Sequence, residues 1–452
     1  MVSDPNVAAL QLAGGESRRQ TDTVHVGDGS TKAMGRGSGR GEVEKRMMSP
    51  TTKDRGRLGR LWPAVLGLGL VVLAGCSDSG RPLTTLDPKG EASSTIHNLV
   101  LPVFVVAGIV FVLTNVGVLY VARKYRRRPG EDDVFPLQIH GNTKLELGWT
   151  IGPAAVMAVV AAMTVNTMVD LSNKGGKSTE AFEITVVGHQ WWWSFEYDLG
   201  RDGTIDFETA NEMVIPSGET VQLTLTSRDV IHSFWIPALN GKKDAAPGRE
   251  HPLWMQAENP GRFLGQCTEF CGLSHGYMRM LVDAKTPDQF QAWVEDQQTK
   301  AALPEEGSAA RRGLETFAGQ CASCHLVEGI NGPDCTPITE LEAYDPAENT
   351  CWVGASPYAG AAQVSGAAPN LTHLMSRYIF VGGLYELRNV ETGELNRNNL
   401  EGWIRNPQDY KPMAPDPTRG NLYGRGMPKL PLTEDQIDDL VAYLSTLGAT
   451  RA

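Results

Sequence analysis

The sequence predicts a multidomain membrane protein, with a two-helix transmembrane hairpin followed by an all-β sandwich and an all-α domain. Three observations predict this order. Two long apolar runs flank a basic loop in the first half, short segments alternating apolar and polar residues fill the middle, and an amphipathic helix closes the chain. The chain has 452 residues, which is too long for one ordinary domain.

The formal net charge of -11 is unevenly distributed. Residues 1–170 carry slightly more basic than acidic side chains, whereas residues 171–452 are strongly acidic. Such asymmetry indicates two environments, here a membrane with a basic inner face and an aqueous exterior. The acidic exterior gives solubility, and it would equally steer a basic protein partner. A nucleic-acid partner is not expected.

Residues 1–75 are predicted to be a leader with a signal peptide. Residues 1–46 are rich in Gly, Ser and Arg without apolar periodicity, which indicates disorder or a start site placed too early. Three arginines then precede an apolar run, 61–73, that is too short to span a bilayer. The run ends in LAGC, which resembles the bacterial lipoprotein signal and implies lipidation of Cys76. Ordinary cleavage and an uncleaved anchor are the alternatives.

Two runs are long and apolar enough to cross a bilayer, residues 97–122 and 147–169. They define a hairpin over 97–170, preceded by an outer segment, 76–96. Short basic loops lie in the cytoplasm, so both ends of the hairpin and the long C-terminal region face outward. We therefore expect a two-pass protein of a bacterial cell membrane. The basic side chains of the loop are Arg123, Lys124, Arg126, Arg127, Arg128 and Lys144.

The spans themselves offer no metal site. They hold no histidine cluster, and their ionisable residues lie at the ends, among them Glu146 at the inner start and Asp170 at the outer end of the second span. Any chemistry within the membrane must therefore come from a partner subunit.

Residues 171–297 are predicted to form the all-β sandwich. The stretch FEITVVGHQWWWSFEY is rich in β-branched and aromatic residues, and Val221, Leu223 and Leu225 alternate with polar neighbours. Gly and Pro turns separate these short strands, as in small sandwiches.

One loop of this domain, QCTEFCGLSHGYM, carries the residue types of a copper site. Thiolate, imidazole and thioether together favour copper over zinc or magnesium. A single-copper electron-transfer site uses one cysteine, and a second cysteine allows two thiolates to bridge two copper ions. The candidate ligands are His232, Cys267, Cys271, His275 and Met278.

With these motifs the domain resembles subunit II of the haem–copper cytochrome c oxidases. GHQWWWSFEY, DVIHSFWIP, KKDAAPGR and GQCTEFCGLSHGYM stand in the order of that family, over residues 95–285. The resemblance implies a cupredoxin-like fold that binds a binuclear copper centre, CuA. It also implies that Cys267 and Cys271 bridge the coppers, and that the other ligands are His232, His275, Met278 and the backbone carbonyl of Glu269.

The same resemblance assigns a role to the tryptophan run. Trp191 is expected to take the electron from the donor, with core packing as the alternative. Trp192 and Trp193 are left to packing. In an extended strand Trp191 and Trp193 would face one side and Trp192 the other.

Three acidic residues receive expectations from the family pattern. The side chain of Glu269 implies a magnesium site at the boundary with subunit I, and Asp244 matches an acidic position near it, with a solvated loop aspartate as the alternative. Glu146 matches a glutamate near the mouth of a proton channel in subunit I. A helix-capping or loop role is the alternative for Glu146.

Residues 311–452, after a polar linker at 298–310, carry the attachment motif of a covalent haem. CASCH is the C-x-x-C-H signature of c-type haem, in which Cys321 and Cys324 form thioethers and His325 is the proximal ligand. Zinc binding and thiol redox chemistry are the alternatives.

The end of the chain supports an all-α haem domain. TEDQIDDLVAYLSTLG is an amphipathic helix with a capping box at Thr433 and Gln436 and a terminating Gly448. Small cytochromes c pack such a helix against the helix before the haem motif.

The haem needs a second axial ligand. Met427 is preferred, because an MP dipeptide precedes the final helix in the cytochrome domains that this one resembles. Met413 and then Met375 are the other candidates. WIRNPQDYKP and APNLTHL also resemble that cytochrome family, and His373 in the second motif is expected to be structural.

Residues 333–367 depart from the family pattern and read as an insertion. They contain Cys335 and Cys351, two cysteines without a role in the copper or haem sites. Because disulfides form in exported proteins, we hypothesise that these two pair and close the loop.

Two redox sites in one chain predict electron transfer. The resemblance to caa-type oxidases implies that haem c receives an electron from a cytochrome c or a quinol-oxidising complex and passes it to CuA. The family route then leads to subunit I, where oxygen is reduced and protons are pumped, and subunit III is a further expected partner. Fusion raises the local concentration of the donor.

Three other functions fit parts of the pattern. A CuA subunit of a nitric oxide reductase would look similar, and its catalytic partner would distinguish it. A quinol oxidase subunit II lacks the copper-binding cysteines. A membrane-tethered copper-binding lipoprotein without turnover would need no haem motif.

Overall fold

The computed structural model describes residues 82–126, 140–175, 182–331, 336–338, 350–352, 368–413 and 426–448. These residues belong to one compact unit. The leader, the predicted lipidation site Cys76 and most of the predicted insertion lie outside the described residues, as do Cys335 and the side chain of Cys351.

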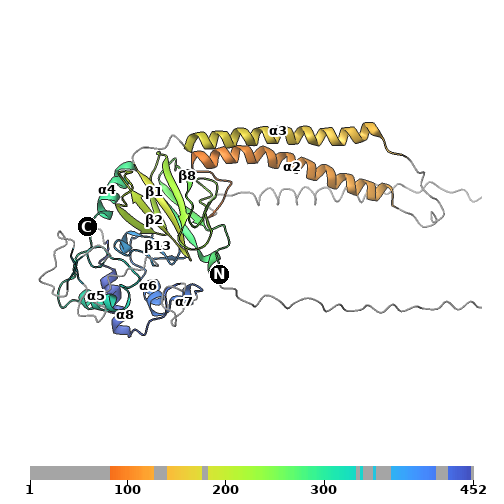
Figure 1. Ribbon diagram of the computed structural model, residues 1–452. Coiled ribbons are helices and arrows are strands. Elements are labelled where there is room, and N and C mark those ends of the chain that lie inside the picture. Colours follow the sequence, from red (N-terminus) through yellow and green to blue (C-terminus); the bar gives the residue numbers. More distant parts are fainter. Residues whose placement is uncertain are drawn as a thin grey trace, which may run out of the picture. The chain divides into compact units, whose positions relative to one another are not determined.

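Two long helices form the predicted hairpin. α2 is Glu91–Lys124 and α3 is Thr143–Gly175, and they lie side by side (Figure 1). Both are long and apolar enough to cross a membrane, with a mean hydropathy of 2.6 for α2 and 1.7 over Thr143–Ser172 of α3. Their large apolar side chains point outward, as expected of helices that are solvated by lipid.

The predicted sandwich is also present. It has a five-stranded sheet in the order β3-β2-β1-β5-β8 and a three-stranded sheet in the order β4-β10-β9, with a separate β6-β7 pair (Figure 1). The strands are β1 Glu183–His189, β2 Trp192–Asp198, β3 Phe207–Ala210, β4 Glu212–Pro216, β5 Val221–Ser227, β6 His232–Phe234, β7 Lys243–Ala245, β8 His251–Met255, β9 Gly261–Gln266 and β10 Arg279–Lys285.

Alternating side chains build the core of the sandwich. β5 buries Val221, Leu223 and Leu225 and leaves the residues between them partly exposed, as the period of two predicts. Helix α4, Pro287–Gln297, adds to this core, and its Phe290 stacks on Phe182 with ring centroids 5.2 Å apart.

The stretch GHQWWWSFEY is a hairpin rather than one continuous strand. β1 ends at His189 and β2 begins at Trp192, which pair with each other, so Gln190 and Trp191 form the turn. Trp191 and Trp193 join the sandwich core, whereas Trp192 stacks on the His189 ring at 4.1 Å. The prediction that all three tryptophans share one strand is therefore wrong at Trp191, because Trp191 lies in the turn before β2.

The C-terminal domain, which we define as the described residues after 308, is mainly helical, as predicted. Two short strand pairs, β11-β12 and β13-β14, are additions that the sequence did not predict. The elements are α5 Ala309–Gln320, β11 Thr336–Ile338, β12 Thr350–Trp352, η4 Leu374–Ser376, β13 Ile379–Phe380, β14 Tyr385–Glu386, α6 Arg397–Arg405, α7 Pro407–Tyr410 and α8 Glu434–Leu444.

The expected packing of the last helix on the helix before the haem motif is confirmed. α8 begins at the predicted capping box of Thr433 and Gln436 and packs on α5. Gly313 of α5 permits this close approach, because a Cβ at this position would lie 1.9 Å from the Asp439 carbonyl oxygen. Phe317 and Tyr443 then meet with ring centroids 5.4 Å apart.

Polar contacts attach the sandwich to one end of the helical hairpin. Ser93, in the first turn of α2, donates through its hydroxyl to the Ala238 carbonyl at 2.6 Å. Trp254 of β8 donates through Nε1 to the Leu171 carbonyl near the end of α3 at 2.9 Å. The sandwich is therefore tied to the start of α2 and the end of α3.

Candidate metal centre

Two parts of the chain bring the predicted copper ligands together, the start of β6 and the connection between β9 and β10. His232 begins β6, and Cys267 follows directly after β9. Cys271 lies in the loop, His275 begins the short helix η1, His275–Tyr277, and Met278 directly precedes β10. The connection over residues 267–278 joins β9 and β10, which are antiparallel neighbours in one sheet.

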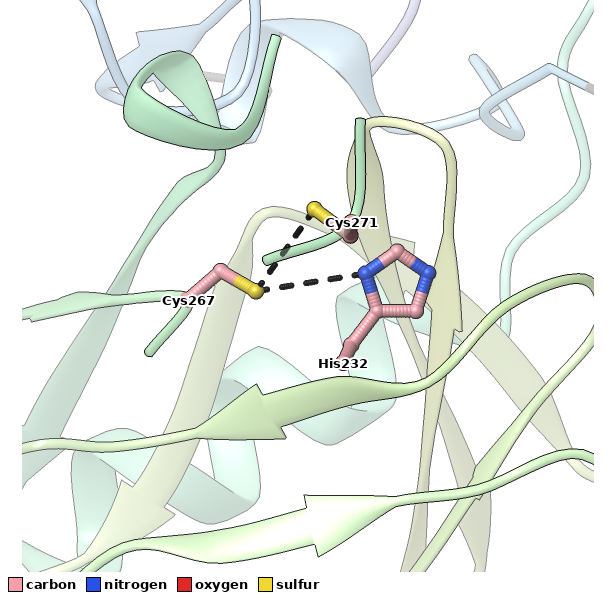
Figure 2. A group of neighbouring side chains, drawn as sticks. All are labelled: His232, Cys267 and Cys271. Carbon is pink, nitrogen blue, oxygen red and sulfur yellow. Dashed lines mark hydrogen bonds between the residues drawn. The ribbon is translucent and has the colours of Figure 1, made fainter. Parts of the chain in front are cut away.

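Figure 2 shows His232, Cys267 and Cys271 pointing toward one another. The Cys267 sulfur lies 3.8 Å from the Cys271 sulfur and 3.9 Å from His232 Nδ1 (Figure 2). The ligand atoms of these three residues all lie within 4.8 Å of one another. His232, Cys267 and Cys271 are almost completely buried, so a metal bound here would be shielded from water.

The other predicted ligands lie against the same two sulfurs. Cys271 Sγ is 3.5 Å from His275 Nδ1 and 3.8 Å from Met278 Sδ. Cys267 Sγ is 3.4 Å from the Glu269 carbonyl oxygen. The structure thus brings together all six residues that the sequence singles out.

This donor set fits soft metal ions. Two sulfurs bound to one ion at about 2.3 Å, the length of a zinc–thiolate bond, lie at most about 4.6 Å apart. The observed 3.8 Å meets that condition, and it is far longer than a disulfide bond of about 2.05 Å. Two sulfurs, two imidazoles and a thioether are ligands that favour copper.

The two thiols titrate as a pair. The hydrogen bond with Cys271 lowers the pKa of Cys267 to about 4, although burial opposes the shift. The same hydrogen bond, followed by burial, raises the pKa of Cys271. One thiolate therefore forms easily, and the second thiol needs a cation to take the place of its proton.

Asp229 orients the His232 ring. Burial alone would lower the pKa of His232, but hydrogen bonds with Asp229 and Cys267 outweigh it and raise this pKa. Asp229 Oδ1 lies 2.9 Å from His232 Nε2, which leaves Nδ1 to face Cys267. The carboxylate is itself fixed by the backbone N–H groups of Gln190 and Val230, both at 2.7 Å.

The predicted electron acceptor Trp191 lies directly beside the metal centre. Its indole Nε1 donates to the carbonyl of Cys271 at 2.9 Å, and Gln190 Nε2 donates to the same oxygen at 2.7 Å. Trp193 instead meets the His232 ring edge-on, with centroids 5.7 Å apart. Trp191 is thus bonded to the ligand loop, whereas Trp193 packs behind it.

The side chains of the predicted acidic residues are not part of this cluster among the described residues. Asp244 and Glu269 have exposed side chains and do not belong to the close His232, Cys267 and Cys271 group among the described residues. Glu146 lies in the first turn of α3, where its carboxylate faces the positive end of the helix dipole. That position agrees with the helix-start role, and its proton-channel role stays a prediction.

The haem motif forms a turn at the end of α5. The N–H groups of Cys324 and His325 both donate to the Cys321 carbonyl at 3.0 Å. His325 Nδ1 lies 2.9 Å from the Pro369 carbonyl, which can only accept, so Nδ1 carries the proton. Nε2 is then the nitrogen with a lone pair, as a proximal iron ligand requires.

Two of the three candidate axial methionines are neighbours. A Cβ on Gly426, directly before Met427, would lie 2.3 Å from Met413 Sδ. Met413 also packs on the sandwich core. Met375 lies in the core of the C-terminal domain, where its N–H donates to Leu447 at 2.8 Å. His373 is buried, and burial lowers its pKa, as fits a neutral structural histidine.

Comparison with known proteins assigns both outer domains. The family described as cytochrome c oxidase subunit II, periplasmic domain, matches residues 198–285, and the cytochrome c family matches residues 310–448. Cytochrome c oxidase subunit 2 of Alkalihalophilus pseudofirmus is 33% identical, covering 83% of this chain and 93% of that protein. The chain belongs to the cytochrome c oxidase subunit II family.

A second relative agrees with this membership. Cytochrome c oxidase subunit 2 of Bacillus sp. (strain PS3) is 31% identical and covers 85% of this chain and 96% of its own length. A crystal structure of the periplasmic domain of subunit II from Bradyrhizobium japonicum is 34% identical, covering 27% of this chain and 96% of that chain, with a TM-score of 0.25. In this family member, a cytochrome c domain follows the subunit II domain.

Sequence reasoning missed three residues that contact the site. Gln190 and Asp229 lie within the quoted family motifs, and the spacing of Asp229 three residues before His232 was the available signal. Lys411, whose ammonium donates to the Trp191 carbonyl, lies 220 residues from Trp191 in the chain. It lies within the quoted motif WIRNPQDYKP, but nothing in that motif indicates a contact with the sandwich.

Proposed function

We propose that this chain is the electron-input subunit of a haem–copper cytochrome c oxidase, an oxidoreductase and translocase. The observation that carries the proposal is the convergence of two buried cysteines, two histidines and a methionine in a chain that also holds a c-type haem motif. A chain with two such sites can receive an electron at one and release it from the other.

The residues around the copper have separate tasks. When bound, the copper pair and the haem each accept and release single electrons without bond rearrangement. Cys267 and Cys271 would hold the metal ions, and burial of both sulfurs excludes water from the site. The remaining ligands are His232, His275, Met278 and the Glu269 carbonyl.

The residues of the haem motif also have separate tasks. Cys321 and Cys324 would attach the haem, and the Pro369 carbonyl holds His325 with Nε2 unprotonated. Met427 is the proposed second axial ligand, with Met413 as its neighbour and competitor.

Trp191 is the proposed link between the two redox groups. Its indole N–H donates to the carbonyl of Cys271, a bridging ligand, so few bonds separate the ring from a copper-bound sulfur. Burial of the ring keeps this contact fixed.

The remaining proposals concern the complex. We place the outer domains on the outer face of a bacterial cell membrane, with Cys76 as the lipidated N-terminus. Electrons would come from a cytochrome c or a quinol-oxidising complex and pass to subunit I, with proton translocation there and subunit III as a further partner. Glu269 and Asp244 would border a magnesium ion, and Glu146 a proton channel.

A second candidate is the CuA subunit of a nitric oxide reductase, because its copper and haem sites would have the same form. Quinol oxidase subunit 2 of Bacillus anthracis is also similar, 30% identical over 52% of this chain. The two cysteines at the metal centre speak against that function. A copper-binding lipoprotein without turnover would leave the haem motif and Trp191 without a purpose.

Electron paramagnetic resonance and optical spectra of the copper-loaded, haem-matured full chain test the proposal. A seven-line copper hyperfine pattern, together with a c-type haem absorbance, is the expected result. A four-line pattern of a single copper, or no copper signal, would overturn the bridging role of Cys267 and Cys271. Oxygen or nitric oxide consumption by the purified complex then separates the two candidate functions.

A further inference from the structure

The face of the sandwich that carries Trp191 is covered by the C-terminal domain. Lys411 donates through its ammonium group to the Trp191 carbonyl, and Ser274 donates through its hydroxyl to the Pro412 carbonyl. The N–H of Arg279 donates to the Gly382 carbonyl at 2.8 Å. Gly382 allows this approach, since a Cβ there would lie 2.8 Å from the Tyr277 carbonyl oxygen.

A second group of contacts centres on Glu212 of β4. Its carboxylate is 4% exposed and accepts hydrogen bonds from the N–H groups of Tyr378 and Ile379, both at 2.6 Å. Arg262 of β9 lies over the Tyr378 ring, with 3.7 Å between the guanidinium carbon and the ring centroid. One segment of the C-terminal domain is therefore held by a carboxylate and covered by a guanidinium from the sandwich.

A cationic side chain of the C-terminal domain acts on Glu212 across the same boundary. Arg377 is buried beside it, and its guanidinium also donates to the Asn370 carbonyl. A buried carboxyl group is costly unless it is hydrogen-bonded, and residues of the C-terminal domain supply both of these hydrogen bonds. Separation of the two domains would leave the Glu212 carboxyl group and two N–H groups without these hydrogen bonds.

We propose that Glu212 is a positioning residue that clamps the C-terminal domain onto the sandwich. Trp191 then receives electrons from the chain's own haem, and soluble donors cannot reach it. This inference rests on the proposed function, because it presupposes a haem in one domain and copper in the other. The step is the transfer of one electron, from ferrous haem to the oxidised copper pair, with no bond made or broken.

The clamp has a mechanical consequence. A haem on a free tether would reach Trp191 only by diffusion of its domain, and its rate would fall as solvent viscosity rises. A clamped haem keeps a fixed distance, so its transfer rate is independent of viscosity. Soluble donors then deliver electrons to the C-terminal domain and not to the sandwich.

The test uses the full chain, copper-loaded and haem-matured, in wild-type form and as four variants. Glu212→Ala removes the acceptor, and Glu212→Gln keeps a carbonyl oxygen in its place. Lys411→Met removes the contact with Trp191 from the other domain. Glu258→Gln is the matched control, because Glu258 is an exposed carboxylate of the sandwich outside these contacts.

Two measurements decide the outcome. Amide hydrogen exchange at Tyr378 and Ile379 reports the clamp without any redox step, and we expect it to rise by about 10- to 100-fold in Glu212→Ala. The rate of copper reduction after photoreduction of the haem reports its function. We expect this rate to be independent of glycerol in wild type and Glu258→Gln, lower and viscosity-dependent in Glu212→Ala, and largely restored in Glu212→Gln.

Two results would overturn the proposed clamp. Unchanged exchange and an unchanged, viscosity-independent rate in Glu212→Ala would overturn the clamp, as would a viscosity-dependent wild-type rate. Should Glu212→Ala fail to fold, Lys411→Met decides by the same two readouts. Spectra without binuclear copper or c-type haem in the wild-type chain would instead refute the proposed function, so the two failures are distinguishable.

Discussion

At the scale of single residues, the metal centre depends on groups that do not bind metal. His232 can present Nδ1 to the two sulfurs only while its ring is held in one orientation. Asp229 fixes the ring through a hydrogen bond with His232 Nε2, and two backbone N–H groups fix the Asp229 carboxylate in turn. Partners of this kind fix the tautomer and the ring orientation of ligand histidines, and metal affinity depends on both.

Replacing Asp229 with alanine should therefore weaken copper binding without removing a ligand. We expect a loss of about 10- to 100-fold in copper affinity, the usual effect of deleting a hydrogen-bond partner of a ligand histidine. Competition with a copper chelator, followed by the copper absorbance, measures it. Asp202→Ala, at an exposed aspartate of the β2–β3 loop, controls for the lost charge. Equal affinities in the two variants would refute the role of Asp229.

At the scale of elements, the contact between α5 and α8 supports the proposed haem site, because Cys321 of the haem motif directly follows α5. Gly313 lies where the helices are closest, with room for a hydrogen atom but not for a methyl group. Gly319 lies on the same helix, and a Cβ there would meet nothing within 4 Å. The same substitution should thus have opposite effects at two positions of one helix.

Gly313→Ala should destabilise the C-terminal domain by about 1–3 kcal/mol, because overpacking forces the helices apart. Gly319→Ala should be neutral or stabilising by up to about 1 kcal/mol, because alanine is the better helix former. Chemical unfolding followed at the haem absorbance compares the two variants. A Gly313→Ala chain as stable as Gly319→Ala would contradict the close packing.

At the scale of the whole molecule, the loop of the helical hairpin and the outer domains should lie on opposite sides of the membrane. The loop between α2 and α3 should lie in the cytoplasm, because it is basic. Ser93 and Trp254 tie the sandwich to the other ends of these helices. The sandwich should therefore lie on the outer face.

Cysteine labelling in intact cells tests this orientation. A membrane-impermeant maleimide should label Glu258→Cys in whole cells, and Lys144→Cys only after lysis, both relative to the unsubstituted chain. Glu258 and Lys144 are exposed, so accessibility within the fold does not limit either reaction. Labelling of Lys144→Cys in whole cells would reverse the proposed topology.

The boundary between the domains should also make stability depend on pH. Burial raises the pKa of Glu212 to about 7 from an ordinary value of 4.5, although the Ile379 and Tyr378 N–H groups and Arg377 oppose the shift. Because the folded state holds this proton more tightly than the unfolded chain, the resulting stability is complete below about pH 4.5. It is lost as the pH rises through about 7.

Glu212→Gln lacks this titration and serves as the reference. Between pH 4.5 and 7 the free energy of unfolding of the wild type should fall relative to that of the variant, by at most on the order of 3 kcal/mol. Denaturant unfolding at several pH values measures the difference. Glu208, whose pKa burial also raises to about 7, should add a similar dependence that Glu208→Gln removes. If the free energy of unfolding of the wild type fell relative to that of Glu212→Gln as the pH was lowered, this account would be contradicted.

Much of the molecule follows from local sequence patterns. The hairpin, the alternating strand β5 and the capped helix α8 appear where periodicity and end signals predict them. The six predicted metal-centre residues converge because four of the side chains come from one short loop. Trp191 is an instructive difference, since the strand pattern placed it in β2 whereas it lies in the turn before that strand.

The sequence by itself determined the order of the domains, the membrane spans and the residue types at both candidate redox sites. These depend on hydrophobic period, loop charge and motif spacing, which are local properties of the chain. Only the tertiary structure decided that Asp229 orients His232, that Gly313 admits α8, and that Glu212 and Lys411 join the two outer domains. Glu212 and Tyr378 are 166 residues apart in the chain, and a hydrogen bond over that separation exists only once both domains have folded and buried it.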